Sequence, residues 1–459
     1  MAVRISLRSP SASKPDSVRK ISASVSMCMG SGRSIQPLCE WYDRTQGSAL
    51  FMDASFLEVD VAAIRRNYRR LRDLVGPQTR ICPVIKGNAY GMGATEVGRV
   101  LQQAGASMLA VYDANEALEV LQAGIRCPIL VLGPDPVYLR GSPLRGYCNE
   151  GRVHFTVHGL DHWHRIRKVL TPDVTPIPLH LEMDTGLRRG GTPLPEVEAL
   201  VREILNEPRV RLAGVSTHFV SSDRDAALTE AQHTLVREEV QRLRGFFPED
   251  LIVHVANSCA TLADRNTHAD MVRVGQAWAG FGVEFLSDGR RLPLALDLEP
   301  CLRWSTTLRL CKRVARGERV GYHGEWTADQ DSVLGLVPVG YAAGWSPFLS
   351  GRDGHAAPKV RLMTAQGEAW VPVAGAVNMD QTVLDLGPAI SEGLCPKVGD
   401  RVELITPNRQ APNHLVRLAS HAGLRPYAIA CGIHPSVRRV YVDGHAEIET
   451  SFPIREGVR

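Results

Sequence analysis

Eight short apolar runs, most of them followed by a helical pattern, restrict the fold of this chain more than any other feature. Each run is rich in Val, Ile and Leu, which is typical of buried parallel strands. The runs are 81–86, 107–112, 128–133, 153–158, 178–183, 211–219, 251–257 and 271–278. Eight such units within roughly 225 residues predict a closed (β/α)8 barrel, which typically takes about 250 residues. An open doubly wound sheet is the competing architecture.

The pattern changes after about residue 290. Short Val- and Leu-rich segments such as 359–364 and 401–406 are separated by Gly, Asp and Asn turns. This pattern predicts a mostly antiparallel β domain. We therefore expect an α/β plus β chain with a barrel over 51–290 and a C-terminal β domain over 291–459.

The N-terminal extension, residues 1–50, differs from both. It is rich in Ser and Arg and has little apolar periodicity, so we expect it to be disordered. Two explanations stay open: a basic transit peptide, or a start assigned upstream of Met52, which directly precedes the first clear element.

Composition limits the classes of function. The 459 residues carry a net charge of only +4, which indicates neither a nucleic-acid partner nor another polyanion. The ten cysteines show no CxxC pair or other metal-ligand spacing, so we expect no metal and a reducing, cytoplasmic location. No apolar run approaches the roughly 20 residues that cross a bilayer.

The segment ICPVIKGNAYGMG, 81–93, carries the clearest chemical signal. Its apolar run ends at Lys86, and a glycine-rich turn follows directly. Apolar surroundings lower the pKa of a lysine, and a deprotonated amine is a nucleophile. The alternative is a solvated lysine at a strand end.

Further polar side chains fall where other predicted strands end, which is where barrel enzymes place their active sites. They are Glu182, Arg189, His218, His254, Asn257, Ser258 and Arg273. Isolated acids such as Glu116 are more often solvated or capping groups.

Several further motifs follow one another along the chain: VIKGNAYG, EMDTGLRRGG, STHFVSSD, HVANSCA, DMVRVG, VGYHGEWTA, VPVGYAAGW and AVNMDQ. In this order, over residues 54–445, they together resemble the alanine racemase family. The resemblance implies a barrel with a C-terminal β domain, pyridoxal phosphate as cofactor, and interconversion of L- and D-alanine. It also implies a cytoplasmic homodimer that supplies D-alanine for peptidoglycan.

The resemblance assigns a role to each matching residue. Lys86 matches the lysine that binds the cofactor covalently and acts as one acid/base group. Tyr322 matches the opposite acid/base group, donated by the partner subunit. The positions that match cofactor-binding residues are Tyr90, Arg189, His218, Asn257, Ser258, Arg273, Gly275, Gln276 and Tyr427.

Substrate-binding and supporting positions follow in the same way. Arg189 and Tyr341 match residues around the substrate, and Asn378, Met379 and Asp380 match partner-subunit residues near its carboxylate. His254 matches a neighbour of Arg273. Glu182 stands where the family commonly has a carbamylated lysine, so we expect its carboxylate to orient Arg189.

Alternatives within the same fold remain. Ala343 replaces an acid that is usual at the substrate entrance, so a broad-specificity amino-acid racemase is the closest alternative. A decarboxylase of this fold would carry a cysteine-containing motif in the β domain, and a non-catalytic pyridoxal phosphate-binding protein would lack that domain. Neither pattern fits this sequence.

Overall fold

The computed structural model describes residues 54–134, 141–172, 175–283, 290–444 and 446–447. The extension 1–50, with its expected disorder, lies outside the described residues. Among the described helices, none is both long and apolar enough to span a membrane. The cysteines that the structure describes are free thiols: Cys82, Cys127, Cys148, Cys259, Cys301, Cys311, Cys395 and Cys431.

Each of the eight predicted barrel runs overlaps a strand. They are β2 (Arg80–Pro83), β3 (Leu109–Val111), β4 (Ile129–Val131), β5 (Val153–Val157), β6 (Ile177–Asp184), β8 (Val210–Ser216), β9 (Ile252–His254) and β10 (Met271–Val274). The order β3-β4-β5-β6-β8-β9 forms one parallel sheet, and β10 pairs with β2 in parallel. The short β7 (Thr192–Pro193) pairs with the end of β6.

Backbone contacts join these two sheets into a ring. A parallel bridge connects Val84, directly after β2, to Ala110 of β3. On the other side, the amides of Asp270 and Arg273 donate to the carbonyls of Val253 and Ala256, at 3.1 and 2.9 Å. The predicted (β/α)8 barrel is therefore confirmed.

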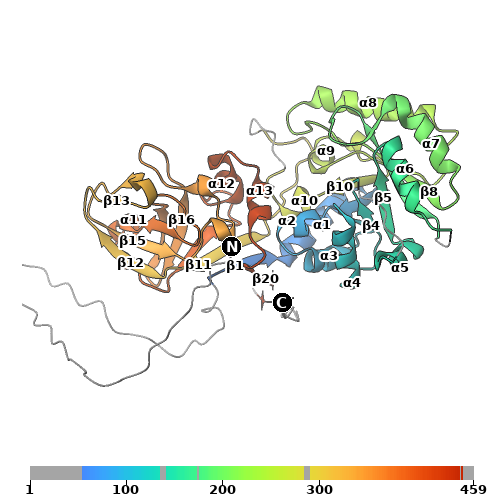
Figure 1. The fold of residues 1–459 in the computed structure, drawn as a ribbon. Coiled ribbons are helices and arrows are strands. Elements are labelled where there is room, and N and C mark those ends of the chain that lie inside the picture. Colours follow the sequence, from blue (N-terminus) through green and yellow to red (C-terminus); the bar gives the residue numbers. More distant parts are fainter. Residues whose placement is uncertain (1–53, 135–140, 173–174, 284–289, 445, 448–459) are drawn as a thin grey trace, which may run out of the picture. The chain divides into compact units, whose positions relative to one another are not determined.

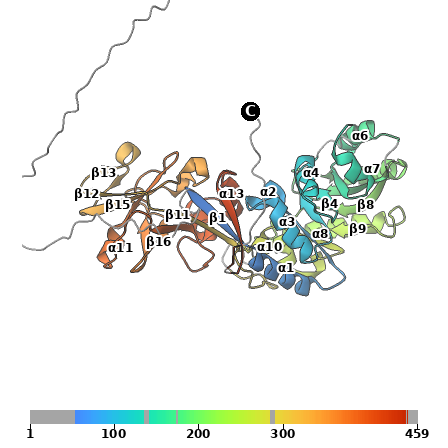
Figure 2. The same cartoon turned by 90° about the horizontal axis from the view of Figure 1, so that it is seen from below.

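Amphipathic helices cover the strands, as Figures 1 and 2 show. In the helix α1 (Val61–Val75), the apolar side chains at helical spacing are buried. The Asp60 carboxylate caps the N-terminus of this helix by accepting from the Ala63 amide at 2.9 Å. The helices are α1 (Val61–Val75), α3 (Ala94–Gln103), α4 (Ala114–Gln122), α5 (Leu144–Asn149), α6 (Leu160–Val169), α7 (Val197–Leu205), α8 (Ala226–Arg242), α9 (Ser258–Ala263) and α10 (Gln276–Ala279).

The C-terminal region is built on a seven-stranded sheet of order β17-β16-β19-β11-β1-β20-β21, in which β1 is Ser55–Asp60. A three-stranded sheet, β12-β15-β18, and the pair β13-β14 complete its strands. The strands are β11 (Leu302–Thr307), β12 (Leu310–Val314), β13 (Arg319–Val320), β14 (Trp326–Thr327), β15 (Ser332–Val337), β16 (Lys359–Thr364), β17 (Gly367–Pro372), β18 (Thr382–Asp385), β19 (Arg401–Ile405), β20 (Arg438–Asp443) and β21 (Ala446–Glu447). The helices are α11 (Gly387–Ser391), α12 (Leu415–His421) and α13 (Pro426–Gly432). The expected β domain is confirmed.

One strand lies in a different sheet from the one expected. The strand β1 (Ser55–Asp60) falls within 51–290, the range expected for the barrel, yet it pairs antiparallel with β11 and parallel with β20. Its alternating burial suits an amphipathic strand in either sheet, so local sequence could not choose between them. The boundary near residue 290 stays a prediction.

Candidate active site

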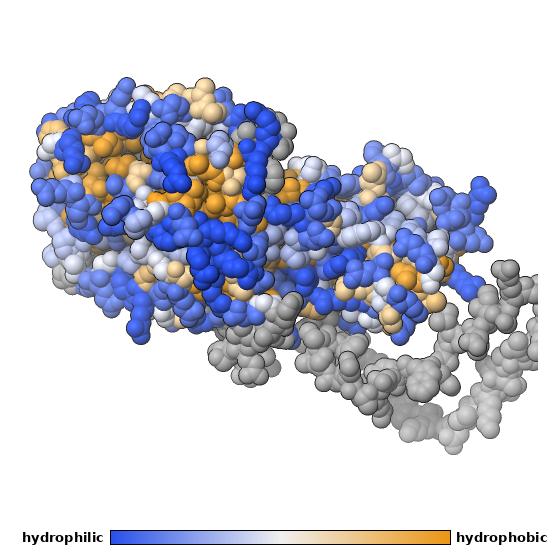
Figure 3. Space-filling model, turned by 180° about the vertical axis from the view of Figure 1, so that it is seen from behind, coloured by the Kyte–Doolittle hydropathy of each residue, from blue (hydrophilic) through white to orange (hydrophobic). Residues whose placement is uncertain are grey.

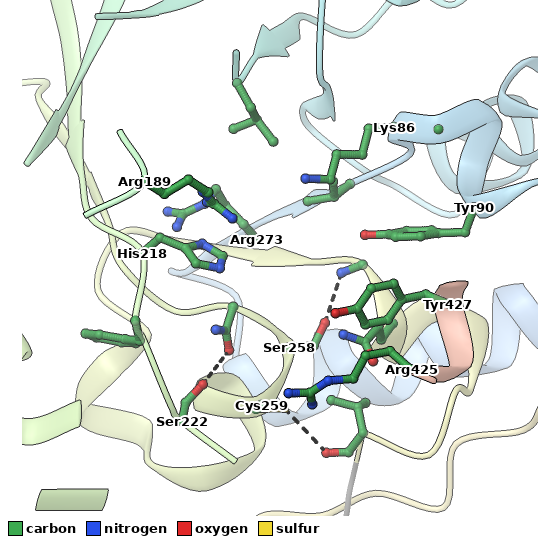
Figure 4. Close-up of a pocket in the computed structure, with 18 of the residues that line it drawn as sticks. Lys86, Tyr90, Arg189, His218, Ser222, Ser258, Cys259, Arg273, Arg425 and Tyr427 are labelled. Carbon is green, nitrogen blue, oxygen red and sulfur yellow. Dashed lines mark hydrogen bonds between the residues drawn. The ribbon is translucent and has the colours of Figure 1, made fainter. Parts of the chain in front are cut away.

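A cavity of about 2110 Å³ opens at the C-terminal ends of the barrel strands. Residues between 409 and 431 complete its wall. Figure 4 shows basic and aromatic side chains projecting into it from several strand ends. It is lined by many of the residues that the sequence singled out: Lys86, Tyr90, Glu182, Arg189, His218, Asn257, Ser258, Arg273, Gly275, Gln276 and Tyr427.

Lys86 is the first residue of α2 (Lys86–Tyr90), a turn with left-handed backbone. Residues 87–90 of this turn have positive φ values of 62°, 53°, 52° and 56°. Left-handed conformations cost residues with a Cβ about 1–2 kcal/mol each, so this turn is held by its surroundings. The Glu116 carboxylate supplies part of that support, because it accepts from the amides of Gly87 at 2.6 Å and Tyr112 at 2.7 Å.

The environment of Lys86 favours the neutral amine. Burial lowers the pKa of its ammonium, and the positive charge of Arg189 lowers it further. The carboxylates of Glu116 and Glu182 act in the opposite direction. The Nζ atom lies 5.9 Å from the centre of the Tyr112 ring. The net result is a lysine that deprotonates more readily than one in water.

The opposite end of the cavity presents hydrogen-bond donors suited to an anion. The Ser258 hydroxyl oxygen accepts from the amides of Gly275 at 2.9 Å and Ala277 at 3.3 Å, which leaves its proton available. A Cβ on Gly275 would lie 2.0 Å from the Tyr90 hydroxyl. Tyr427 also lines this end (Figure 4). Hydroxyl donors of this kind can hold a phosphate group.

Arg273 and His254 are buried on the barrel side, and His218 lies beside Arg273 at the cavity (Figure 4). Arg273 donates to the ring Nδ1 of His254 at 2.8 Å, to the His254 carbonyl, and to the Thr217 carbonyl at 2.6 Å. Burial lowers the pKa of His218 to about 3, and the charge of Arg273 adds to that effect. The pKa of His254 is also well below its ordinary value for the same two reasons. Both imidazoles are therefore neutral at physiological pH.

Glu182 and Arg189 both border the cavity, but the structure records no hydrogen bond or ion pair between them among its described residues. The nearest recorded ionic partner of Glu182 is His158, with 3.9 Å between Oε2 and Nδ1. The expectation that Glu182 orients Arg189 stays a prediction.

The residues expected from the partner subunit do not line this cavity, and Tyr341, which was expected around the substrate, does not line it either. Tyr322 begins the short helix η4 (Tyr322–Gly324) and is 69% exposed. Tyr341 begins η5 (Tyr341–Ala343), and its amide donates to the Asn378 carbonyl at 3.0 Å, while the Ala342 amide donates to the Met379 carbonyl at 2.9 Å. Tyr341, Met379 and Asp380 are exposed, so the β domain presents these side chains outward.

The sequence did not identify every polar residue at the cavity. Glu116 was interpreted as a solvated or capping acid; it does cap local amides, but at the cavity wall beside Lys86. Arg425 was not predicted, yet it lies beside Tyr427 in Figure 4 and pairs with Asp223 at 3.6 Å. Its position two residues before Tyr427 was the available signal.

The face shown in Figure 3 has apolar residues gathered on the barrel side within a border of hydrophilic ones. Among the described residues, no group of three His, Cys, Asp or Glu side chains is arranged to hold a metal ion.

Sequence comparison connects this geometry to known proteins. Residues 59–282 match the family described as alanine racemase, N-terminal domain, and residues 301–441 match alanine racemase, C-terminal domain. An alanine racemase from Treponema pallidum is 32% identical over 393 residues, covering 84% of this chain and 98% of that protein. One from Lactobacillus delbrueckii is also 32% identical, covering 84% and 96%.

Solved structures similar to this chain are also alanine racemases. Alanine racemase from Streptomyces lavendulae has a TM-score of 0.74 at 29% identity, covering 85% of this chain and 97% of that one. The Bacillus anthracis enzyme with bound L-Ala-P has a TM-score of 0.74 at 28% identity, covering 86% and 97%. The chain therefore belongs to the alanine racemase family and is an isomerase that racemises alanine.

Proposed function

We propose that the chain interconverts L- and D-alanine by a two-base mechanism, with pyridoxal phosphate bound at Lys86. The observation that carries this proposal is the lowered pKa of Lys86 in a cavity that also offers the proton of the Ser258 hydroxyl as a hydrogen-bond donor. The close approach of Tyr90 to Gly275 supports the fit, because that approach leaves no room for a side chain at position 275.

The residues of the cavity suit different parts of this cofactor. Tyr90, Ser258, Gly275, Gln276 and Tyr427 would hold its phosphate. Arg273 would face the ring nitrogen, and because a guanidinium only donates hydrogen bonds, it would keep that nitrogen unprotonated. Asn257 would support this end, since its side chain caps α9 by accepting from the Ala260 amide at 3.0 Å.

Two groups would move the proton. When bound, pyridoxal phosphate supplies an electron-withdrawing ring that lowers the cost of removing the proton from the substrate Cα. Lys86 Nζ would take or return that proton on one face, and Tyr322 Oη on the other. Arg189 would orient the substrate carboxylate and His218 would lie beside the cofactor ring.

The exposure of Tyr322 supports a site shared between subunits. A phenol that acts on the substrate must reach the cavity, and Tyr322 of one chain does not line its own. We therefore propose a homodimer in which the partner supplies Tyr322, Tyr341, Asn378, Met379 and Asp380. The product would serve peptidoglycan synthesis in the cytoplasm.

A broad-specificity amino-acid racemase is the second candidate, because Ala343 makes the turn beside Tyr341 less acidic than is usual in the family. Incubation with L-alanine and with D-alanine, each with pyridoxal phosphate, should give the opposite enantiomer at comparable catalytic efficiency. Serine, arginine and lysine tested in parallel would separate the two candidates. Absence of D-alanine formation by the cofactor-loaded enzyme would overturn the proposal.

A further inference from the structure

Three buried histidines form a row across the barrel interior beside Arg273. His254 ends β9, His180 lies within β6 and His154 lies within β5, and they are 1%, 0% and 5% exposed. Nδ1 of His180 lies 2.8 Å from Nε2 of His254, and Nδ1 of His154 lies 2.9 Å from Nε2 of His180. Each ring is thus hydrogen-bonded to the next.

Arg273 fixes the direction of these bonds. Its guanidinium lies 2.8 Å from His254 Nδ1, and an arginine can only donate. The proton of His254 must then be on Nε2, from which it is donated to His180 Nδ1. By the same argument His180 carries its proton on Nε2 and donates to His154. At the far end, the backbone of Gly151 makes a hydrogen bond that favours a proton on His154.

The backbone provides the space that this row needs. β8 lies between β6 and β9, and Gly214 of β8 is opposite His180. A Cβ on Gly214 would lie 2.4 Å from His180 Nδ1, the atom that accepts from His254. The pairing of β6 with β8 shifts register between Leu179 and His180, which brings Gly214 to that place. The glycine therefore admits the bond between the two rings.

The row of histidines also bears on the buried positive charge of Arg273. Arg273 is only 7% exposed, and burial lowers the pKa of its guanidinium. The charge of Glu182 acts in the opposite direction, but among the described residues no carboxylate forms an ion pair with Arg273. Burying a cation without a paired carboxylate is costly. Three aligned imidazoles present a lone pair to the guanidinium and transmit their polarisation from ring to ring. They stabilise the charge of Arg273 without neutralising it.

Protonation of the row would break it. A charged imidazole has two N–H groups, so one would face the N–H of its neighbour. Burial lowers the pKa of each ring: that of His154 to about 4, and those of His180 and His254 well below the ordinary value. The lowered pKa values therefore favour the neutral form of all three rings at neutral pH.

We propose that His254, His180 and His154 form a hydrogen-bonded row of a single tautomer that holds Arg273 as a cation facing the cavity. His180 and His154 are then positioning residues, which act on the reaction only through Arg273. This role deepens the proposed function, since it depends on Arg273 facing the cofactor ring.

Nitrogen NMR tests the tautomers directly. Full-length protein with 15N-labelled histidine is measured from pH 6 to pH 8, with and without pyridoxal phosphate, and signals are assigned with single His→Gln variants. We expect protonated Nε2 and bare Nδ1 in all three rings throughout. A protonated Nδ1 in any of them, or averaged signals from rapid exchange as in a proton relay, would overturn the proposal. Failure to bind pyridoxal phosphate would instead count against the proposed function.

Kinetics test whether the row acts on Arg273. In His154→Phe, His180 loses the ring nitrogen that accepts its hydrogen bond, at the end of the row farthest from Arg273. In His154→Gln, the glutamine side chain can still accept from His180 and donate onward in the same direction. We expect His154→Phe to lower kcat about fivefold with KM nearly unchanged and to shift the absorption band of the bound cofactor, whereas His154→Gln stays within about twofold of wild type.

The matched control is His268→Phe. His268 is also 5% exposed and hydrogen-bonded, to the Thr261 carbonyl at 2.9 Å, but lies outside the row. It should lose stability with kcat and the absorption band unchanged. Equal kcat in His154→Phe and His154→Gln would show that the row does not influence the reaction.

Discussion

The hydroxyl of Tyr90 occupies the space that a side chain at Gly275 would need, with 2.0 Å between that oxygen and the position of a Cβ. Gly275 also donates its amide to Ser258 at 2.9 Å. This one contact therefore connects the strained turn after Lys86 with the donors at the other end of the cavity.

Replacing Gly275 with alanine should weaken cofactor binding. The Cβ would displace Tyr90 and disturb the Ser258 contact, so we expect the dissociation constant for pyridoxal phosphate to rise at least about tenfold, which corresponds to about 1.4 kcal/mol. Absorbance titration of the apoenzyme measures it. Gly146→Ala is the control, because a Cβ there meets nothing within 4 Å. Unchanged affinity in Gly275→Ala would contradict the assignment of this end to the phosphate.

Replacing Glu116 with glutamine should alter both the turn and the amine. Glutamine can accept from only one of the two amides, those of Gly87 and Tyr112, and it lacks the charge that raises the pKa of Lys86. We expect kcat to fall about tenfold and the acidic limb of the pH–rate profile to move to lower pH. The exposed Glu119→Gln serves as the control. A profile that keeps its position would show that Glu116 does not influence Lys86.

Acid should destabilise the fold through its buried neutral histidines. The pKa values of His154 and His414 are lowered to about 4 by burial, whereas an unfolded histidine titrates near 6.5. Below about pH 6.5 these histidines bind protons in the unfolded chain but stay unprotonated in the folded chain. The free energy of unfolding should then fall by up to roughly 1.4 kcal/mol per pH unit for each such histidine, down to about pH 4.

Urea unfolding at pH 7.5, 6.0 and 5.0 measures this slope. In His414→Gln the free energy of unfolding should fall less steeply with pH, because one of the contributing histidines is gone. The exposed His421→Gln should keep the wild-type slope. The same slope in both variants would exclude His414 as a source of the acid sensitivity.

The charge of Glu182 should matter more than its shape. Its carboxylate lies in the cavity, with a side chain 13% exposed. If it balances Arg189, Glu182→Ala and Glu182→Gln should both lower kcat, by about tenfold. Glu196→Gln, at an exposed position of the same cavity, is the control. Wild-type kinetics in Glu182→Gln would indicate that the carboxylate only fills space or caps local amides.

Much of the architecture could be predicted because its signals are local. Each barrel strand is a short apolar run, and each covering helix has an apolar stripe, so their order indicates a barrel. The sheet membership of β1 could not be predicted, because its partners β11 and β20 lie more than 200 residues away.

Some residues of the candidate site could likewise be predicted from the sequence, and others could not. Lys86 stands out because a charge ends an apolar run before glycines. His154 and His180 do not, since a histidine within a strand gives no indication of what it contacts. Gly214 likewise gains its meaning only from a ring on another strand. Contacts between distant strands are what the sequence alone did not disclose.

A subunit-mixing assay tests the central claim most directly, namely that Lys86 of one subunit and Tyr322 of its partner act on the same alanine. Lys86→Ala and Tyr322→Phe are purified separately, shown to have little activity, then mixed under conditions that exchange subunits. Mixed dimers would carry one intact site, so racemisation should recover to about a quarter of the wild-type rate. A mixture that exchanges subunits and stays inactive would contradict the account.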